Sequence, residues 1–138
     1  MTEPTYLFVY GTLRKDFFLP LREKIATDIQ WMDYAKIKGQ LFNIGEYPGA
    51  IPHHVGYIHG EIIKVLAPQK VFRILDDYEG YKQGAEKVAE YRRKKEIAEM
   101  ENGTFVNVWI YWYNFPLGSA ERIRGSDYLN YLKKNQLA

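Results

Sequence analysis

The chain of 138 residues contains no cysteine, which excludes disulfide scaffolds, thiolate zinc sites and cysteine nucleophiles together. It also lacks long apolar segments: runs such as Tyr6–Tyr10 are about five residues long, whereas a membrane-spanning helix needs about 20. A large excess of one charge is missing too, because 19 basic residues face 17 acidic residues and leave a net charge of +2. Proteins that bind nucleic acid non-specifically are much more basic. We therefore expect neither a membrane nor a nucleic acid as a partner.

Residues 1–4 contain an acid and a proline, a composition unlike that of a signal peptide, and we expect a cytoplasmic protein. The sequence also has no linker, repeat or low-complexity segment, so we expect a single domain over residues 1–138. What it has in surplus is aromatic residues: 12 tyrosines, 7 phenylalanines and 3 tryptophans. Such a surplus serves a ring-rich core, a surface on which nucleic-acid bases stack, or a small-molecule pocket.

Three strands are expected in the first half of the chain. Tyr6–Tyr10 is continuously apolar and ends at Gly11, which predicts a strand buried on both faces. Alternating residues predict further strands across Lys36–Ile44 and Tyr57–Leu66. The glycines and prolines of residues 45–52 predict a loop or tight turns between these two strands.

Helices are expected in three places. Pro68 is typical of a first helical turn, and Gly80 is a suitable C-terminal cap for the same helix. Residues 17–31 are open to two interpretations: an amphipathic helix over Pro20–Thr27 with Leu21 and Ile25 inward, or an irregular segment. Ser126 is expected to cap a short terminal helix. The inward residues of that helix are expected to be Tyr128, Leu129 and Leu132.

The longest hairpin signal runs from Tyr91–Glu101 through Asn102-Gly103 to Thr104–Tyr113. Asn-Gly favours a two-residue type I′ turn, because both of its central residues need a positive φ. The second arm is apolar on both faces, so we expect it to be a central strand. Together these elements predict an α+β fold: a small mixed, mostly antiparallel β-barrel with two or three flanking helices.

Two segments have residues suited to chemistry. The turn after the first strand, Tyr10–Arg14, can aim successive backbone N–H groups into one concavity that holds a carboxylate or an oxyanion, although a glycine there also serves an ordinary turn. Asp76, Asp77 and Glu79 end the predicted helix near Gly80, where the negative end of the helix dipole raises carboxylate pKa values. These acids are either simply solvated or tuned for general acid–base catalysis.

Metal binding is not favoured by the pattern. Neighbouring acids on one helix do not all converge on one ion, and His53, His54 and His59 lack a ligand spacing typical of metal sites. We therefore expect no metal and no cofactor. The basic run 92–95 alternates along a predicted strand within a neutral stretch, which is typical of a solvated hairpin arm.

The segment Phe8–Arg14, FVYGTLR, resembles the opening motif of the γ-glutamylcyclotransferase-like (AIG2-like) family. Further segments follow in the family's order, and the resemblance extends from residue 6 to about residue 131. One position departs from the pattern: Asp16 stands where relatives commonly have glycine. The further segments are Gly45–Gly49, His59–Glu61, Leu75–Tyr81, Tyr91–Arg93, Val108–Tyr111 and Gly125–Asp127.

The resemblance implies a small barrel with a cavity and roles for particular residues. It implies that the backbone amides of Tyr10, Gly11, Thr12 and Leu13 bind the glutamyl moiety, and that Glu79 is the general acid/base. It also places further residues in or beside the pocket: Arg14, Tyr47, Tyr81 and Tyr113.

The activity that the resemblance implies is conversion of a small γ-glutamyl amine or amide into 5-oxoproline and a free amine. The nucleophile is the substrate's own α-amino nitrogen, so the protein needs no serine, cysteine or metal. Asp76 and Asp77 are expected to stay solvated or to orient Glu79. One alternative is a non-catalytic domain of the same fold that binds a small carboxylate. Another is a barrel that binds single-stranded nucleic acid by stacking, against which the low charge counts.

Overall fold

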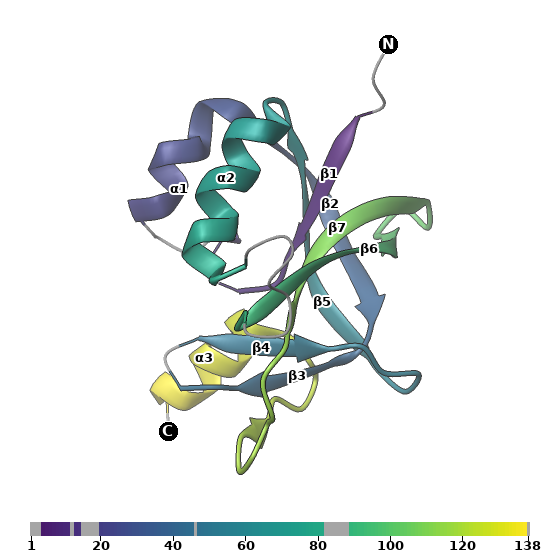
Figure 1. Cartoon of the computed structure of the whole chain (residues 1–138). Helices are drawn as coiled ribbons and strands as arrows, with labels where there is room; N and C mark the ends of the chain where they lie inside the picture. The colour runs from purple at the N-terminus through teal and green to yellow at the C-terminus, as the bar shows by residue number, and fades with distance from the viewer. Residues whose placement is uncertain (1–3, 12, 15–19, 46, 82–88, 138) are drawn as a thin grey trace.

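The computed structural model describes residues 4–11, 13–14, 20–45, 47–81 and 89–137, and Thr12, Asp16 and the segment 82–88 lie outside it. Its main feature is a closed β-barrel in the order β1-β5-β2-β6-β7 (Figure 1). Neighbouring strands are antiparallel except β1 and β7, whose parallel pairing closes the barrel. The predicted mixed, mostly antiparallel barrel is therefore confirmed. The strands are β1 (Thr5–Val9), β2 (Ile29–Lys38), β5 (Tyr57–Val65), β6 (Tyr91–Met100) and β7 (Phe105–Tyr113).

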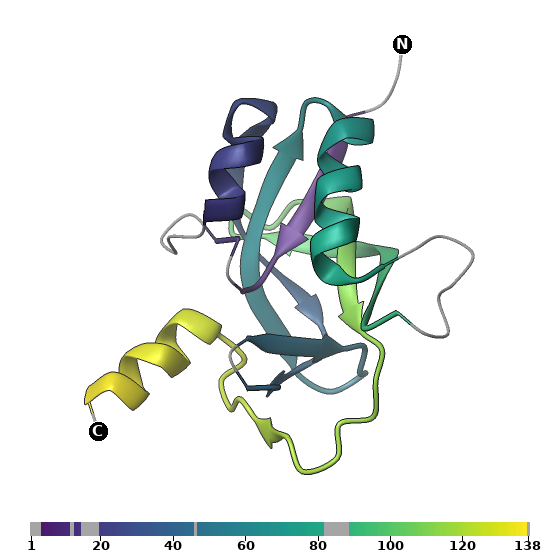
Figure 2. The same cartoon turned by 60° about the vertical axis from the view of Figure 1, so that its left-hand side comes forward.

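A second, three-stranded sheet and three α-helices complete the described fold. The sheet has the order β4-β3-β8. Helices α1 and α2 lie at one end of the molecule, and α3 lies beside β3 and β4 at the other end (Figures 1 and 2). The elements are β3 (Gln40–Asn43), β4 (Pro48–Ile51), β8 (Glu121–Arg122), α1 (Pro20–Ile25) followed by a 3₁₀ turn (Ala26–Asp28), α2 (Pro68–Glu79) and α3 (Tyr128–Leu137).

Two hydrophobic cores lie on opposite faces of the barrel strands. Phe8 and Ile110 belong to the core inside the barrel, whereas Leu7 and Tyr111 belong to a second core that includes buried residues of α1 and α2. Side chains alternate between faces along a strand, so a strand between two cores must be apolar at every position. This is the reason that β1 and β7 are apolar on both faces, as the sequence predicted. The two cores also account for much of the aromatic surplus.

Two predictions around residues 36–52 are wrong. The strand expected over Lys36–Ile44 is divided into β2 and β3, which belong to different sheets. The break lies at Gly39, where a Cβ atom would stand only 2.7 Å from the backbone oxygen of Ile51. The loop expected over residues 45–52 contains β4, which begins at Pro48 on an edge of its sheet. An edge position tolerates proline because the missing N–H is not needed for the ladder.

The β6–β7 hairpin forms as expected, but its turn differs from the predicted type. The N–H of Gly103 donates to the carbonyl of Met100 at 2.9 Å, and the N–H of Met100 donates to the carbonyl of Thr104 at 2.8 Å. Gly103 has a φ of +88°, whereas Asn102 has no positive φ. The loop thus has three residues with a left-handed glycine at its end, rather than two left-handed residues.

One of the two predicted helix caps is confirmed and the other is wrong. Gly80 ends α2 with a φ of +70°, as predicted. Ser126, however, has a φ of +54° and lies before the helix; the carboxylate of Asp127 instead accepts the N–H of Asn130 at 3.3 Å. Asp127 is therefore the cap of α3, and Tyr128 is its buried residue.

The structure also decides between the two interpretations of the segment 17–31, as far as its residues are described. Its described part is the short helix α1 followed by the 3₁₀ turn and the beginning of β2. Ile25 is fully buried in the core under the helices, as expected for an inward residue. The side chain of Leu21 lies outside the described part of the structure.

Candidate active site

The turn that follows β1 lies against the beginning of β4. The N–H of Arg14 donates to the carbonyl of Gly11 at 3.2 Å and closes the turn. A Cβ atom at Gly11 would stand 2.9 Å from Cγ of Pro48, so the close approach requires glycine at this position. Tyr10 and Leu13 on either side are buried. The predicted substrate-binding loop is thus held directly beside the second sheet.

A cavity of about 200 Å³ opens between this turn, the C-terminal end of α2 and the beginnings of β4 and β6. It brings together several residues that the sequence singled out: Tyr10, Gly11, Leu13, Tyr47 and Glu79. It also contains residues that the sequence analysis did not select as site residues. These are Phe8, Val9, Pro48, Glu90, Tyr91 and Tyr111. Tyr78, which lies in a segment that the resemblance places around the cavity, lines it as well.

Glu79 is the last residue of α2 and lines this cavity. Burial, together with the nearby negative charges of Glu90 and Asp76, raises the pKa of its carboxyl from 4.5 to about 8. Within the described part of the chain, no side chain donates a hydrogen bond to this carboxylate or forms an ion pair with it. A carboxyl group with a pKa near neutral is suited to accepting and returning a proton. Desolvation, more than the helix dipole invoked from the sequence, is the cause.

Glu90 is the second acid of the cavity. The hydroxyl of Tyr47 donates to its Oε2 at 2.5 Å, and the N–H of Asn114 donates to its backbone carbonyl at 2.7 Å. The hydrogen bond to Glu90, together with burial and the negative charge of Glu90, raises the pKa of Tyr47 to about 12. No local signal in the sequence marks Glu90, because it lies among other charged residues just before β6.

Tyrosine hydroxyls surround the two acids. That of Tyr10 donates to the carbonyl of Tyr111 at 2.6 Å, and that of Tyr91 donates to the carbonyl of Pro48 at 2.8 Å. Burial is the main cause that raises the pKa of Tyr10, Tyr91 and Tyr111. These hydroxyls therefore stay protonated at neutral pH. Part of the aromatic surplus thus forms the wall of the cavity.

Asp76 fixes the last turn of α2 to the barrel. Arg93 donates to both of its carboxylate oxygens, at 2.9 Å and 3.1 Å, and the hydroxyl of Tyr111 donates to Oδ1 at 2.5 Å. The Arg93 guanidinium also lies over the rings of Phe72 and Trp109, 4.2 Å and 4.7 Å from their centroids. The expectations of a solvated Asp76 and of a solvated Arg93 are therefore wrong. The strand pattern could not reveal this pair because its partners come from different elements.

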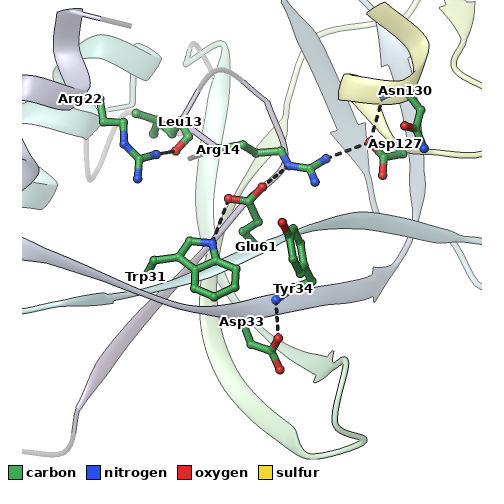
Figure 3. Close-up of polar contacts among 9 residues, drawn as sticks. All are labelled: Leu13, Arg14, Arg22, Trp31, Asp33, Tyr34, Glu61, Asp127 and Asn130. Carbon is green, nitrogen blue, oxygen red and sulfur yellow. Dashed lines mark hydrogen bonds and ion pairs between the residues drawn. The ribbon is translucent and has the colours of Figure 1, made fainter. Parts of the chain in front are cut away.

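Arg14 lies away from the cavity that contains Glu79. Its Nε donates to Oε2 of Glu61 at 2.7 Å and its Nη1 to Oδ1 of Asp127 at 3.0 Å, as Figure 3 shows. The indole N–H of Trp31 donates to the other oxygen of Glu61 at 3.1 Å. Arg14 is 4% exposed and Glu61 is fully buried. Arg14 thus ties the turn after β1 to β5 and to the beginning of α3.

Tyr81 and Tyr113, the other two residues expected at the pocket, do not line the cavity either. Tyr81 is buried in the core under the helices, and the ring of Tyr113 packs edge-on against that of Tyr91, with centroids 5.4 Å apart. Tyr113 thereby supports a cavity residue from behind. Thr12, the third residue of the predicted loop, lies outside the described residues.

Among the described residues, no group of three or more histidines, aspartates and glutamates is arranged to hold a metal ion. The rings of His53 and His54 stack on each other, with centroids 4.7 Å apart. A search of the same residues for a helix with the length and apolar character of a membrane span finds none.

Comparisons with known proteins agree with the geometry. The family described as gamma-glutamyl cyclotransferase, AIG2-like, matches residues 7–130. A curated protein from Methanocaldococcus jannaschii is 28% identical over 131 residues, which cover 91% of this chain and 97% of that protein. The Escherichia coli protein YtfP, named as a gamma-glutamylcyclotransferase family protein, is 26% identical over 135 residues, which cover 90% and 96% of the two chains.

Solved structures have the same fold. The solution structure of YtfP superposes with a TM-score of 0.65 and 27% identity, covering 91% of this chain and 97% of YtfP. The crystal structure of YkqA from Bacillus subtilis gives a TM-score of 0.73 at 24% identity, covering 99% of this chain. The chain spans 44% of YkqA, so it corresponds to less than half of that longer protein.

Proposed function

The chain belongs to the AIG2-like gamma-glutamyl cyclotransferase family, and from this premise we propose that it converts a small γ-glutamyl amine or amide into 5-oxoproline and a free amine. Glu79 is the general acid/base. The observation that supports this proposal is the desolvated carboxyl of Glu79, which lines a cavity beside the Gly11 turn and has no partner among the described side chains. Burial, with the negative charges of Glu90 and Asp76 beside it, brings its pKa to about 8, where one group both takes up and releases a proton near neutral pH.

The reaction needs one substrate and no co-reactant. The α-amino nitrogen attacks the γ-carbonyl carbon, and a carbon–nitrogen bond forms that closes the five-membered ring. The bond from the same carbon to the leaving nitrogen then breaks. Glu79 takes the proton from the attacking nitrogen and returns it to the leaving amine, so that protons and bonds balance. Because both reacting groups are in one molecule, the main task of the protein is to hold the glutamyl chain folded.

The other residues of the cavity bind and orient the substrate. The backbone N–H groups of Gly11 and Leu13 belong to the turn that faces the cavity, and we assign to this turn the binding of the substrate's negatively charged oxygens. Tyr10, Tyr91 and Tyr111 exclude water from the inner wall. With little water present, charges inside the cavity interact more strongly.

The test is the release of 5-oxoproline from a panel of γ-glutamyl amines by wild type and by Glu79→Gln. The variant keeps the shape of the side chain but has no titrating carboxyl, and we expect turnover to fall at least about 100-fold. Asp77→Asn is the matched control, because Asp77 is an exposed acid on the same helical turn outside the cavity lining. We expect this control to keep the wild-type rate.

Two results would contradict the proposal. Full turnover by Glu79→Gln would show that Glu79 is not the acid/base. Binding of the panel by wild type without any 5-oxoproline would instead support the non-catalytic, carboxylate-binding alternative.

A further inference from the structure

The cavity has a buried inner wall and an exposed mouth. Val9 and Tyr10 on the inner wall are 4% and 7% exposed, whereas Tyr47 and Tyr78 are 37% and 48% exposed. Glu90 belongs to the mouth because it is bonded to Tyr47. Whatever part of a ligand points outward must therefore pass these three side chains.

The volume of the cavity limits how much of a ligand it encloses. Ordinary small-molecule sites occupy roughly 300–1,000 Å³. This cavity has about 200 Å³, so it encloses one small moiety. On the proposed function that moiety is the glutamyl group, since it must meet Glu79 and the Gly11 turn. The leaving amine then extends through the mouth, past Tyr47 and Glu90.

Among the described residues, the charged side chains that line the cavity are of one sign. Glu79 and Glu90 are the charged residues among the described ones that line it. The bond from Tyr47 occupies Oε2 of Glu90, and within the described part of the chain Oε1 accepts no hydrogen bond. Glu90 therefore presents a carboxylate oxygen, held in place by Tyr47, to a group at the mouth. A positive charge there gains a charge-assisted hydrogen bond, and a negative charge is repelled.

We infer that the Tyr47–Glu90 pair binds a positive charge on the leaving amine, so that this protein selects γ-glutamyl derivatives of diamines and other cationic amines. The inference rests on the proposed function, because it uses the orientation of the substrate that Glu79 and the Gly11 turn require. Negative charge on Glu90 also raises the pKa of Glu79, and a bound cation would reduce that effect. Glu90 is thus the residue that determines specificity, and Tyr47 positions it.

The test uses three γ-glutamyl amides that differ in the end of the leaving amine. The cationic compound is the monoamide of 1,4-diaminobutane, the neutral compound is the butylamide, and the anionic compound is the amide of 4-aminobutanoate. Their binding is measured by calorimetry with the Glu79→Gln protein, and their turnover is measured with wild type. The cationic compound is expected to bind at least about tenfold more tightly than the anionic compound, as for a charged hydrogen bond.

Variants at the mouth then identify the group responsible. Adding Glu90→Gln to the Glu79→Gln protein should reduce the ratio of the affinity for the cationic compound to the affinity for the anionic compound to near one. Adding Tyr47→Phe keeps the charge of Glu90 but removes its hydrogen-bond donor, and it should reduce the ratio only in part. Asp77→Asn is the control for a change of one charge on a nearby surface, and it should leave the ratio as it is.

The outcomes separate this inference from the proposed function. Equal binding of the three compounds, or a ratio that survives Glu90→Gln, would overturn the inference even if wild type releases 5-oxoproline from all of them. A cationic preference that depends on Glu90 would support the cation site. In that case, absence of 5-oxoproline would count against the proposed reaction alone.

Discussion

Glu79, with Glu90 close by, illustrates at the scale of single residues how a carboxyl group acquires an unusual proton affinity. The two acids line one cavity, and the described part of the chain supplies no cation to either of them. Asp76 is nearby as well, but its charge is compensated by Arg93. The folded protein therefore favours the protonated carboxyl of Glu79 at pH values at which a carboxyl in water is ionised. Ionisation of this group in the folded state then lowers the stability of the protein.

The pH dependence of stability follows from this cost. The pKa of Glu79 is about 8 in the folded protein and 4.5 ordinarily, so the folded state binds the proton more tightly. The stabilisation from this group is fully present below pH 4.5 and is lost as the pH rises through 8. We expect Glu79→Gln to escape this loss. From about pH 5 to about pH 8, the difference in free energy of unfolding between this variant and wild type should grow in favour of the variant by up to about 1.4 kcal/mol per pH unit.

Urea unfolding of both proteins at several pH values checks this prediction. Glu101→Gln, which changes an exposed acid in the β6–β7 loop, should follow the wild-type curve. Parallel curves for wild type and Glu79→Gln would show that Glu79 has an ordinary proton affinity in the folded state.

At the scale of elements, the site depends on α2 and the barrel strands being held at fixed positions. Asp76 precedes Glu79 by one turn of α2 and is bound by Arg93 of β6 and Tyr111 of β7. Gly80 then ends the helix in a left-handed conformation. The helix end therefore has little freedom, and the carboxyl of Glu79 is presented to the cavity by rigid elements rather than by a loop.

The pairing of β1 and β5 sets the position of the turn that contains Gly11, and it depends on Gly60. A Cβ atom at Gly60 would stand 2.4 Å from the backbone oxygen of Val9 and 2.7 Å from the Phe8 ring. Gly60→Ala should therefore force the strands apart and lower stability by about 1–3 kcal/mol. The measurement is the midpoint of thermal unfolding. Arg92→Ala, an exposed change on β6, is the control and should stay within about 0.5 kcal/mol of wild type. An unchanged midpoint for Gly60→Ala would mean that the strands are not this closely packed.

At the scale of the whole molecule, one buried ion-pair network joins distant parts of the chain. Arg14 follows β1, Glu61 is on β5 and Asp127 caps α3, and the three are linked by bonds of 2.7 Å and 3.0 Å (Figure 3). This network lies on another side of the turn from the cavity. It therefore acts on the site through the position of the turn rather than through contact with a substrate.

Breaking the network from one side should be costly. Glu61→Gln removes the charge that faces Arg14 in a buried environment, and we expect a loss of about 3–5 kcal/mol. The double variant Arg14→Met with Glu61→Leu removes both buried charges and leaves the partly exposed Asp127 without Arg14, so it should lose less than the sum of its two single variants. Denaturant unfolding of wild type, Arg14→Met, Glu61→Leu and the double variant gives the coupling energy between the two residues. Additive losses would show that Arg14 and Glu61 do not act as a pair.

Much of the fold could be predicted because its signals are local. A strand that lies between two cores is apolar throughout, and this is visible in Tyr6–Tyr10 and in the second arm of the hairpin. A helix with proline at its start and glycine at its end is equally visible in Pro68–Gly80. The sequence also pointed to Glu79 and the Gly11 turn, but acids and glycines at the ends of elements have ordinary structural uses, and the roles of these residues came from the resemblance to the family's motifs.

What only the tertiary structure decided depends on contacts between residues far apart in the chain. The division of the predicted strand at Gly39 follows from the nearby backbone of Ile51, and the pairing of Asp76 with Arg93 follows from the packing of α2 on the barrel. Glu90 joins the site because β6 begins beside the end of α2. The sequence by itself determined most of the barrel strands, the helix α2 and the motifs at the ends of β1 and α2. Barrel closure decided which charges meet in the cavity, because desolvation and Coulomb interaction depend on distance in space and not on order in the chain.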